Sequence, residues 1–138
     1  MLTDTTRSPY AKVHALDGMN VKWTGGLWKE RFDTCANSTV PQLKHMFDSK
    51  DISHVVENFK ICAGDADGDF DGTVFGDGDF YKWMESAIYT AYQTGNQQLK
   101  DEIEDYIALI GRAQQPDGYL STKQIIGERN QNGVFRMG

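Results

Sequence analysis

The stretch Asp79-Phe-Tyr-Lys-Trp-Met-Glu-Ser-Ala-Ile-Tyr-Thr-Ala-Tyr-Gln-Thr94 carries the clearest structural signal in the sequence. Its apolar residues recur at intervals of three and four, which is the period of a helix with one buried face. Gly95 follows the last turn, as expected at a helix C-terminus, and Asp77 or Asp79 is expected to cap the N-terminus. The pattern therefore predicts a helix over about 79–94, with a buried stripe made of Phe80, Trp83, Met84, Ala87, Ile88, Ala91 and Tyr92.

A second helix is predicted directly downstream, over about 97–114. Asn96 is suited to cap its first turn, and Pro116 ends it because proline cannot continue a helix. The connection between the two helices is short, which favours antiparallel neighbours. The buried stripe expected for this helix is Leu99, Ile103, Tyr106, Ile107 and Ile110.

The region upstream is also helical in pattern. Helical spacing runs from Leu27 to about Phe47, and we expect Pro41 to lie in the first turn of a second helix there. Thr39 is expected to cap that helix, with Gln42 completing a capping box. A further helix is predicted over 52–63, ended by Gly64. A short extended piece is expected at 21–23.

The remaining segments lack periodicity. Residues 1–20 are expected to be an irregular N-terminal segment, and the chain from Asp117 onward is expected to be irregular as well. A length of 138 residues suits one domain, here residues 21–138. The fold class predicted is mainly α, built of antiparallel helical hairpins.

The charge is concentrated in one loop. The chain carries a formal charge of −6, and a single stretch without Lys or Arg contains six aspartates. Such a stretch repels phosphate backbones, so we expect no nucleic-acid partner. No apolar run approaches the ~20 residues that span a bilayer, so no membrane partner is expected. Residues 1–10 show no apolar leader, and the compartment stays open. The six aspartates are Asp65, Asp67, Asp69, Asp71, Asp77 and Asp79.

Part of this loop matches the first eight positions of an EF-hand. Asp67, Asp69 and Asp71 supply the alternate carboxylates and Gly72 the sharp turn. The match ends at position 12, where Gly78 stands in place of a bidentate glutamate. Two readings remain open here: a calcium site on the three aspartates, or a solvated acidic turn.

The cysteines do not indicate a disulfide framework or a metal pair. Cys35 and Cys62 are the only two, and neither lies in a CxxC motif. Both are expected to be small buried hydrophobic residues. His14, His45 and His54 share no metal-ligand spacing and are expected to be surface or packing residues.

Several segments in order resemble glycoside hydrolase family 127, whose members include β-L-arabinofuranosidases. The first two are Gly26-Leu-Trp-Lys-Glu-Arg-Phe32 and Thr39-Val-Pro-Gln42. Glu57-Asn-Phe59 then leads through the acidic loop to Val74-Phe-Gly-Asp-Gly-Asp-Phe-Tyr-Lys-Trp-Met-Glu85, similar to the family's V-F-x-D-S-D-x-Y-K-W-x-E. The last is Ala113-Gln-Gln-Pro-Asp-Gly-Tyr-Leu120. Gly78 and Phe80 depart from the family's usual Ser and Val.

The resemblance implies a larger enzyme. It places these helices in the N-terminal part of a catalytic domain, as the first part of an (α/α)6 barrel. The activity implied is hydrolysis of a terminal L-arabinofuranoside or a related sugar. The partners implied are the carbohydrate substrate and the remainder of the catalytic domain. The family's zinc, cysteine nucleophile and catalytic glutamate belong further along the chain, and Cys35 and Cys62 match none of these residues. No catalytic residue or cofactor is therefore expected in this segment.

Seven residues are candidate substrate contacts, and each has a structural alternative. Asp77 and Asp79 hold sugar hydroxyls or cap a helix, and Lys82 reaches a cavity or forms an ion pair with Glu85. Gln42 points into the cavity or covers a helix end. The other candidates are Asn58, with a helix-to-loop hydrogen bond as its alternative, and Asp117 and Tyr119, which otherwise form a turn.

A second hypothesis stands beside the glycosidase. It is a non-catalytic helical module that binds calcium or carbohydrate through loop 64–79, and a plain helical interaction domain is a third. The glycosidase reading carries a physical expectation. Helices taken from a closed barrel should leave apolar faces that need neighbours outside this chain.

Overall fold

The computed structural model describes residues 6–14 and 21–130, and the described part is helical without strands. The expected extended piece at Val21–Trp23 is irregular, because no second strand lies beside it to pair with. Expectations for residues 1–5, 15–20 and 131–138 lie outside the described residues. The elements are α1 (Gly26–Thr34), the π-helical turn η2 (Cys35–Thr39), α2 (Val40–Asp48), α3 (Val55–Ala63), α4 (Gly76–Thr94), α5 (Gln97–Ala113) and α6 (Thr122–Asn130).

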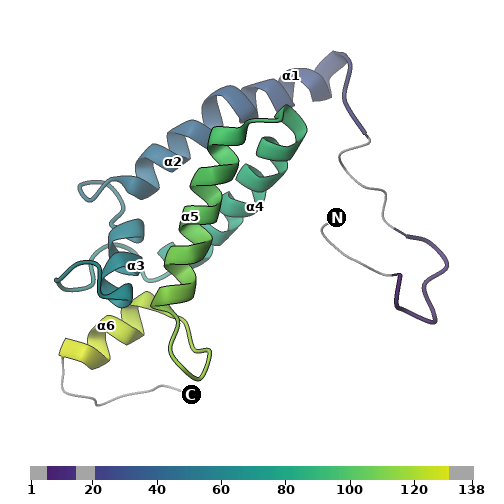
Figure 1. The fold of residues 1–138 in the computed structure, drawn as a ribbon. Helices are drawn as coiled ribbons and strands as arrows, with labels where there is room; N and C mark the ends of the chain where they lie inside the picture. Colours follow the sequence, from purple (N-terminus) through teal and green to yellow (C-terminus); the bar gives the residue numbers. More distant parts are fainter. Residues whose placement is uncertain (1–5, 15–20, 131–138) are drawn as a thin grey trace.

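The helices α1, η2 and α2 follow one another as a single long rod beside the α4–α5 pair (Figure 1). The expected break with a capping box at Thr39 and Gln42 is wrong. Thr39 has helical angles, and its side chain caps nothing. The Val40 amide donates to the Cys35 carbonyl five residues earlier, which is the π pattern. Because Pro41 has no N–H to donate, this register shift lets the helix pass through it unbroken.

The helix α3 begins later than predicted. The residue before it, His54, has a φ of 60°, in the left-handed region. Ile52 precedes this bend and is 60% exposed, so it does not belong to the buried face. The C-terminus is as predicted, with Gly64 at a φ of 82°. A histidine in this backbone region is uncommon, and the sequence pattern did not indicate it.

The hairpin of α4 and α5 is confirmed as an antiparallel pair (Figure 1). Gly95 has a φ of 71°, and the Asn96 side chain accepts the Leu99 amide at 3.0 Å, as predicted for its cap. The N-terminus of α4 differs from the prediction. The helix begins at Gly76 and its N-cap residue is Phe75, so neither Asp77 nor Asp79 caps it.

The chain after Asp117 is not irregular as predicted, since α6 occupies Thr122–Asn130. This helix is short and weakly amphipathic. It has two large apolar side chains, Ile125 and Ile126, and both are buried. Tertiary packing against α3 therefore decides its formation more than local pattern does.

The core centres on aromatic rings from four helices. Phe80 of α4 is fully buried. Its ring centroid lies 5.3 Å from that of Phe47 in α2, 5.7 Å from Phe59 in α3 and 5.2 Å from Tyr106 in α5. Trp83 stacks on Phe80 at 5.5 Å and donates its indole N–H to the Val40 carbonyl at 3.0 Å. These contacts fix the relative positions of all four helices.

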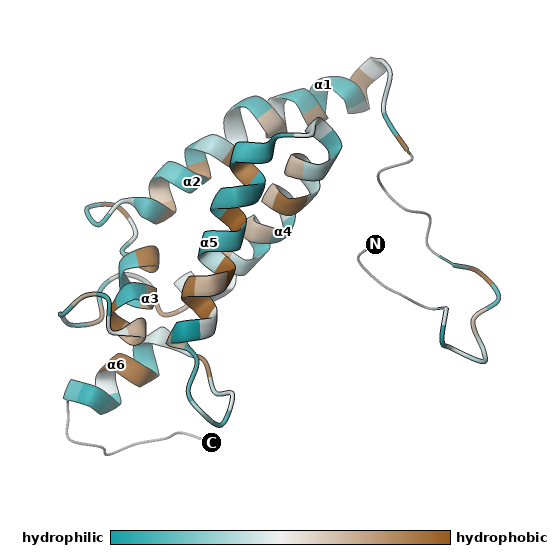
Figure 2. Cartoon of the chain, viewed as in Figure 1, coloured by the Kyte–Doolittle hydropathy of each residue, from teal (hydrophilic) through white to brown (hydrophobic). Residues whose placement is uncertain are grey.

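The two predicted stripes are mostly covered by the chain's own helices. In α4, Tyr92 is the member that stays exposed, and in α5 Ile107 is exposed while Leu109 is buried in its place. The hydrophobic residues of α5 alternate with hydrophilic ones along the helix (Figure 2). The expectation that these apolar faces need neighbours outside this chain is therefore wrong for most of their length. Among the apolar side chains that stay exposed are Leu27 and Trp28 of α1, at 59% and 68%. Among the described helices, none has the length and apolar character to cross a membrane.

Candidate functional site

Asp77 connects the start of α4 to the start of α6. Its Oδ2 accepts the Thr122 amide at 2.8 Å, and its Oδ1 accepts the Thr122 hydroxyl at 2.7 Å. Thr122 is fully buried. The carboxylate thus lies in the first turn of α4 and against the first residue of α6, where both helix dipoles favour negative charge. Asp77 is a helix cap, but for α6 rather than for its own helix.

The buried Cys62 and the partly buried Tyr81, both with shifted pKa values, lie near this contact. Burial raises the pKa of the Cys62 thiol to about 11, and the Asp77 charge adds to the shift. Burial also raises the pKa of Tyr81 to about 12, again with help from Asp77. Cys62 Sγ donates to the Thr122 carbonyl at 3.7 Å. Cys62 is therefore a protonated thiol at neutral pH, not a nucleophile. Cys35 and Cys62 are both free; Cys62 is buried as expected, and Cys35 only partly.

Asn58 joins α3 to the acidic loop. It is 2% exposed, its Nδ2 donates to the Asp71 carbonyl at 2.8 Å, and its Oδ1 accepts the Asp71 amide at 3.3 Å. Both ends of the side-chain amide are engaged. The helix-to-loop hydrogen bond that we considered for Asn58 is confirmed.

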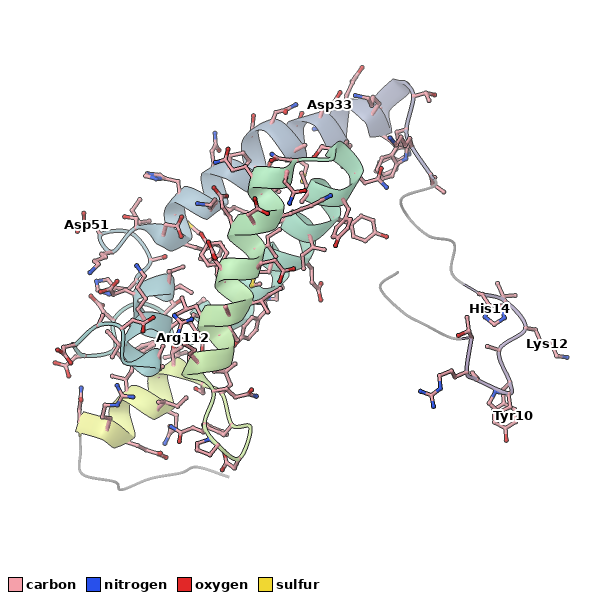
Figure 3. All side chains as sticks on the ribbon, viewed as in Figure 1. Tyr10, Lys12, His14, Asp33, Asp51 and Arg112 are labelled. Atoms are coloured by element: carbon pink, nitrogen blue, oxygen red, sulfur yellow. The ribbon has the colours of Figure 1, made fainter. Side chains whose placement is uncertain are left out.

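Aspartates of the acidic loop contact protein groups on α5, on α6 and at the residue that precedes α3. Asp65 accepts from Arg112 of α5 at 2.6 Å, and Arg112 is labelled in Figure 3. Asp69 accepts from Asn130 of α6, and Asp71 lies 3.5 Å from His54. Within 6–14 and 21–130, no group of three or more His, Cys, Asp or Glu side chains is placed to hold a metal ion. The geometry gives the calcium reading of Asp67, Asp69 and Asp71 no support.

A hollow of about 330 Å³ lies between the π-helical turn, α2 and α4, and we call it the π-turn groove. Two predicted site residues, Asp79 and Lys82, meet at its edge, with Lys82 Nζ 3.0 Å from Asp79 Oδ1. Lys82 thus pairs with Asp79, and the ion pair with Glu85, which was the structural alternative, does not form. The groove is lined by Cys35, Thr39, Val40, Leu43, Met46, Phe47, Asp79, Lys82, Trp83 and Ser86.

A second hollow of about 380 Å³ lies between α2, α3 and α5. The Tyr106 hydroxyl on its wall donates to Asp48 Oδ1 at 2.5 Å. Burial, together with this hydrogen bond, raises the pKa of Tyr106. The ion pair of Asp65 and Arg112 lies at the same hollow. None of the seven predicted site residues lines it.

The other predicted residues lie away from both hollows. Gln42 is exposed on α2. Asp117 and Tyr119 belong to the loop between α5 and α6, where Asp117 Oδ1 accepts the Tyr119 amide at 3.0 Å. Gly118 between them has a φ of 89°. This is the turn predicted as their structural alternative.

Sequence reasoning missed the residues that hold α6. The sequence pattern predicts an irregular segment at Thr122 and indicates no role for Arg129. Arg129 donates to the carbonyls of Ile61 and Cys62, at 2.6 and 3.1 Å, and so occupies the C-terminal end of α3. The available signal was Ser121-Thr122 after a turn, a pattern typical of helix starts.

The chain is similar to known β-L-arabinofuranosidases. Residues 20–136 match a family model described as the catalytic domain of GH127 β-L-arabinofuranosidase. A non-reducing end β-L-arabinofuranosidase of Bifidobacterium longum subsp. longum is 38% identical over 122 residues, covering 75% of this chain and 18% of that protein. A crystal structure of a GH127 β-L-arabinofuranosidase from Geobacillus stearothermophilus T6 aligns with a TM-score of 0.73 and 38% identity, covering 82% of this chain and 19% of the other. The chain thus spans about a fifth of the length of these relatives.

Replacing Asp77 by alanine is expected to release α6. The buried Thr122 amide would lose its acceptor, which costs about 1–3 kcal/mol. Urea unfolding measures the loss, and hydrogen exchange of the α6 amides is expected to accelerate. Asp67→Ala, at an exposed carboxylate of the acidic loop, is the control and should change little. Unchanged exchange in α6 of the Asp77→Ala variant would contradict the capping role.

Stability is expected to fall at alkaline pH. The pKa of Cys62 rises from 9.0 to about 11 on folding and that of Tyr81 from 10.0 to about 12. Between pH 9 and 12 the unfolded chain therefore binds fewer protons than the folded chain, so the free energy of unfolding decreases as pH rises. Urea unfolding over this range measures the slope. Cys62→Ala and Tyr81→Phe should each make the slope shallower. A slope equal to that of the unaltered chain in both variants would refute the raised pKa values of Cys62 and Tyr81.

Proposed function

We propose, from the fact that this chain belongs to glycoside hydrolase family 127, that it is the N-terminal part of a catalytic domain that hydrolyses terminal β-L-arabinofuranosides or a related sugar. The observation that carries the proposal is the match of residues 20–136 to the family's catalytic domain. The antiparallel α4–α5 pair suits the start of an (α/α)6 barrel, in which such pairs repeat around an axis. The substrate, and the remainder of the catalytic domain as partner, are parts of this proposal.

The catalytic groups are assigned to the rest of the polypeptide. A retaining glycosidase needs an acid/base and a nucleophile about 5 Å apart. Three groups considered for these roles are engaged otherwise: Cys62 is a buried thiol, both oxygens of Asp77 bind Thr122, and Asp79 pairs with Lys82. The described residues also offer no set of ligands that fits the zinc implied by the resemblance. No catalytic step is therefore assigned to zinc at these residues.

Substrate contact is proposed chiefly for Asp79 and Lys82. They lie at the edge of a hollow, with side chains 46% and 78% exposed. The Lys82 ammonium has three donors and Asp79 has a second oxygen, so the pair keeps hydrogen-bonding capacity for a hydroxyl. Gln42, Asp117 and Tyr119 are exposed and stay candidate contacts. Asn58 and Asp77 are proposed to support the site, Asn58 by holding the acidic loop on α3 and Asp77 by joining α4 to α6.

The test uses the complete polypeptide that contains this sequence. We expect it to release p-nitrophenol from the p-nitrophenyl β-L-arabinofuranoside and to leave the α-anomer uncleaved. The 138-residue chain alone is expected to release none, since its catalytic partners are elsewhere. Absence of β-L-arabinofuranosidase activity in the complete, zinc-supplied polypeptide would overturn the proposal, and so would equal activity of the isolated chain.

A further inference from the structure

We propose that the π-turn groove is a subsite for one uncharged monosaccharide unit. This deepens the proposed function, on which it rests for the choice of sugar. The groove's volume of about 330 Å³ lies within the range of small-molecule sites, which is roughly 300–1,000 Å³. Its walls come from two sides, the π-helical turn with α2 and the first turns of α4.

The charges at the groove favour a neutral ligand. Asp79 and Lys82 stand side by side with Nζ and Oδ1 3.0 Å apart, so their charges cancel. An anion would approach the Asp79 carboxylate, and a cation would approach the Lys82 ammonium. A pair of adjacent sugar hydroxyls meets no such conflict, because each hydroxyl both donates and accepts. One can donate to the carboxylate while its neighbour accepts from the ammonium.

The rest of the lining combines hydroxyl groups with apolar side chains. Thr39 and Ser86 bring hydroxyls from opposite walls, and the Ser86 hydroxyl donates to the Lys82 carbonyl at 3.3 Å while its oxygen can still accept. Leu43, Met46 and the buried Trp83 contribute apolar side chains to the lining. A monosaccharide has this same division, with hydroxyls around its edge and C–H groups on its face.

The two walls of the groove are joined by a hydrogen bond. The Trp83 indole N–H donates to the carbonyl of Val40, the residue that follows the π-helical turn, at 3.0 Å. This buried hydrogen bond links α4 directly to the opposite wall. Turns of π-helix occur frequently at functional sites, where they reshape one wall of a helix. A preformed groove binds without the entropy cost of ordering its walls.

The experiment is an NMR titration of the full 138-residue chain, labelled with ¹⁵N, with L-arabinose. We expect binding with a Kd on the order of millimolar, as fits one sugar in an open groove. Amide shifts should concentrate in η2, α2 and the first turns of α4, and the Trp83 indole N–H should shift with them. Lys82→Met and Thr39→Val are each expected to weaken binding about tenfold, the loss of one good hydrogen bond.

The matched control is Lys29→Met, which removes the ion pair with Asp33 on α1, away from the groove, and should leave binding unchanged. The subsite is overturned by absence of localised shifts, by an unchanged Kd in Lys82→Met, or by equal shifts with charged sugar phosphates. Arabinose binding without β-L-arabinofuranosidase activity of the complete polypeptide would refute the proposed function alone. Activity without groove binding would refute the subsite alone.

Discussion

The fully buried Phe80 ring lies where α2, α3, α4 and α5 meet, and the arrangement of these helices depends on it. Each neighbouring ring belongs to a different element or a different turn, so the cluster sets the distances between helices as well as burying area. Trp83 extends it to α2 through its bond to the Val40 carbonyl. That contact also defines one wall of the π-turn groove, which makes the candidate subsite a direct product of the core packing.

The polar contacts attach the shorter segments to this core. Asp77 holds the start of α6, Arg129 returns from α6 to the end of α3, and Asn58 ties the acidic loop to α3. In sequence, Asn58 lies on a polar side of its predicted helix and Asp77 flanks a helix start, which makes both candidate substrate contacts. In the structure both have structural partners. Of the seven candidates, Asp79, Lys82, Gln42, Asp117 and Tyr119 remain as proposed substrate contacts.

Local rules predicted what depends on neighbours along the chain. The α4 stripe, the Asn96 cap and the left-handed Gly64 and Gly95 followed from spacing and residue type. The failures have tertiary causes. The cap at Asp77 serves a helix 45 residues away, and a π turn lets the chain pass Pro41 without the break that proline suggests. The helix α6 is stabilised by packing against α3 and by the hydrogen bonds that Asp77 accepts from Thr122.

The most direct test of this account is the free energy of unfolding of Phe80 variants, measured with urea on the dilute chain. We expect Phe80→Ala to lower it by about 3–5 kcal/mol, with loss of the near-ultraviolet circular dichroism of the packed rings. Phe80→Leu should cause a smaller loss in a chain that still folds, and Tyr89→Ala, at a residue 42% exposed, should change little. A free energy of unfolding unchanged within about 0.5 kcal/mol in both Phe80 variants would contradict the central role of the ring.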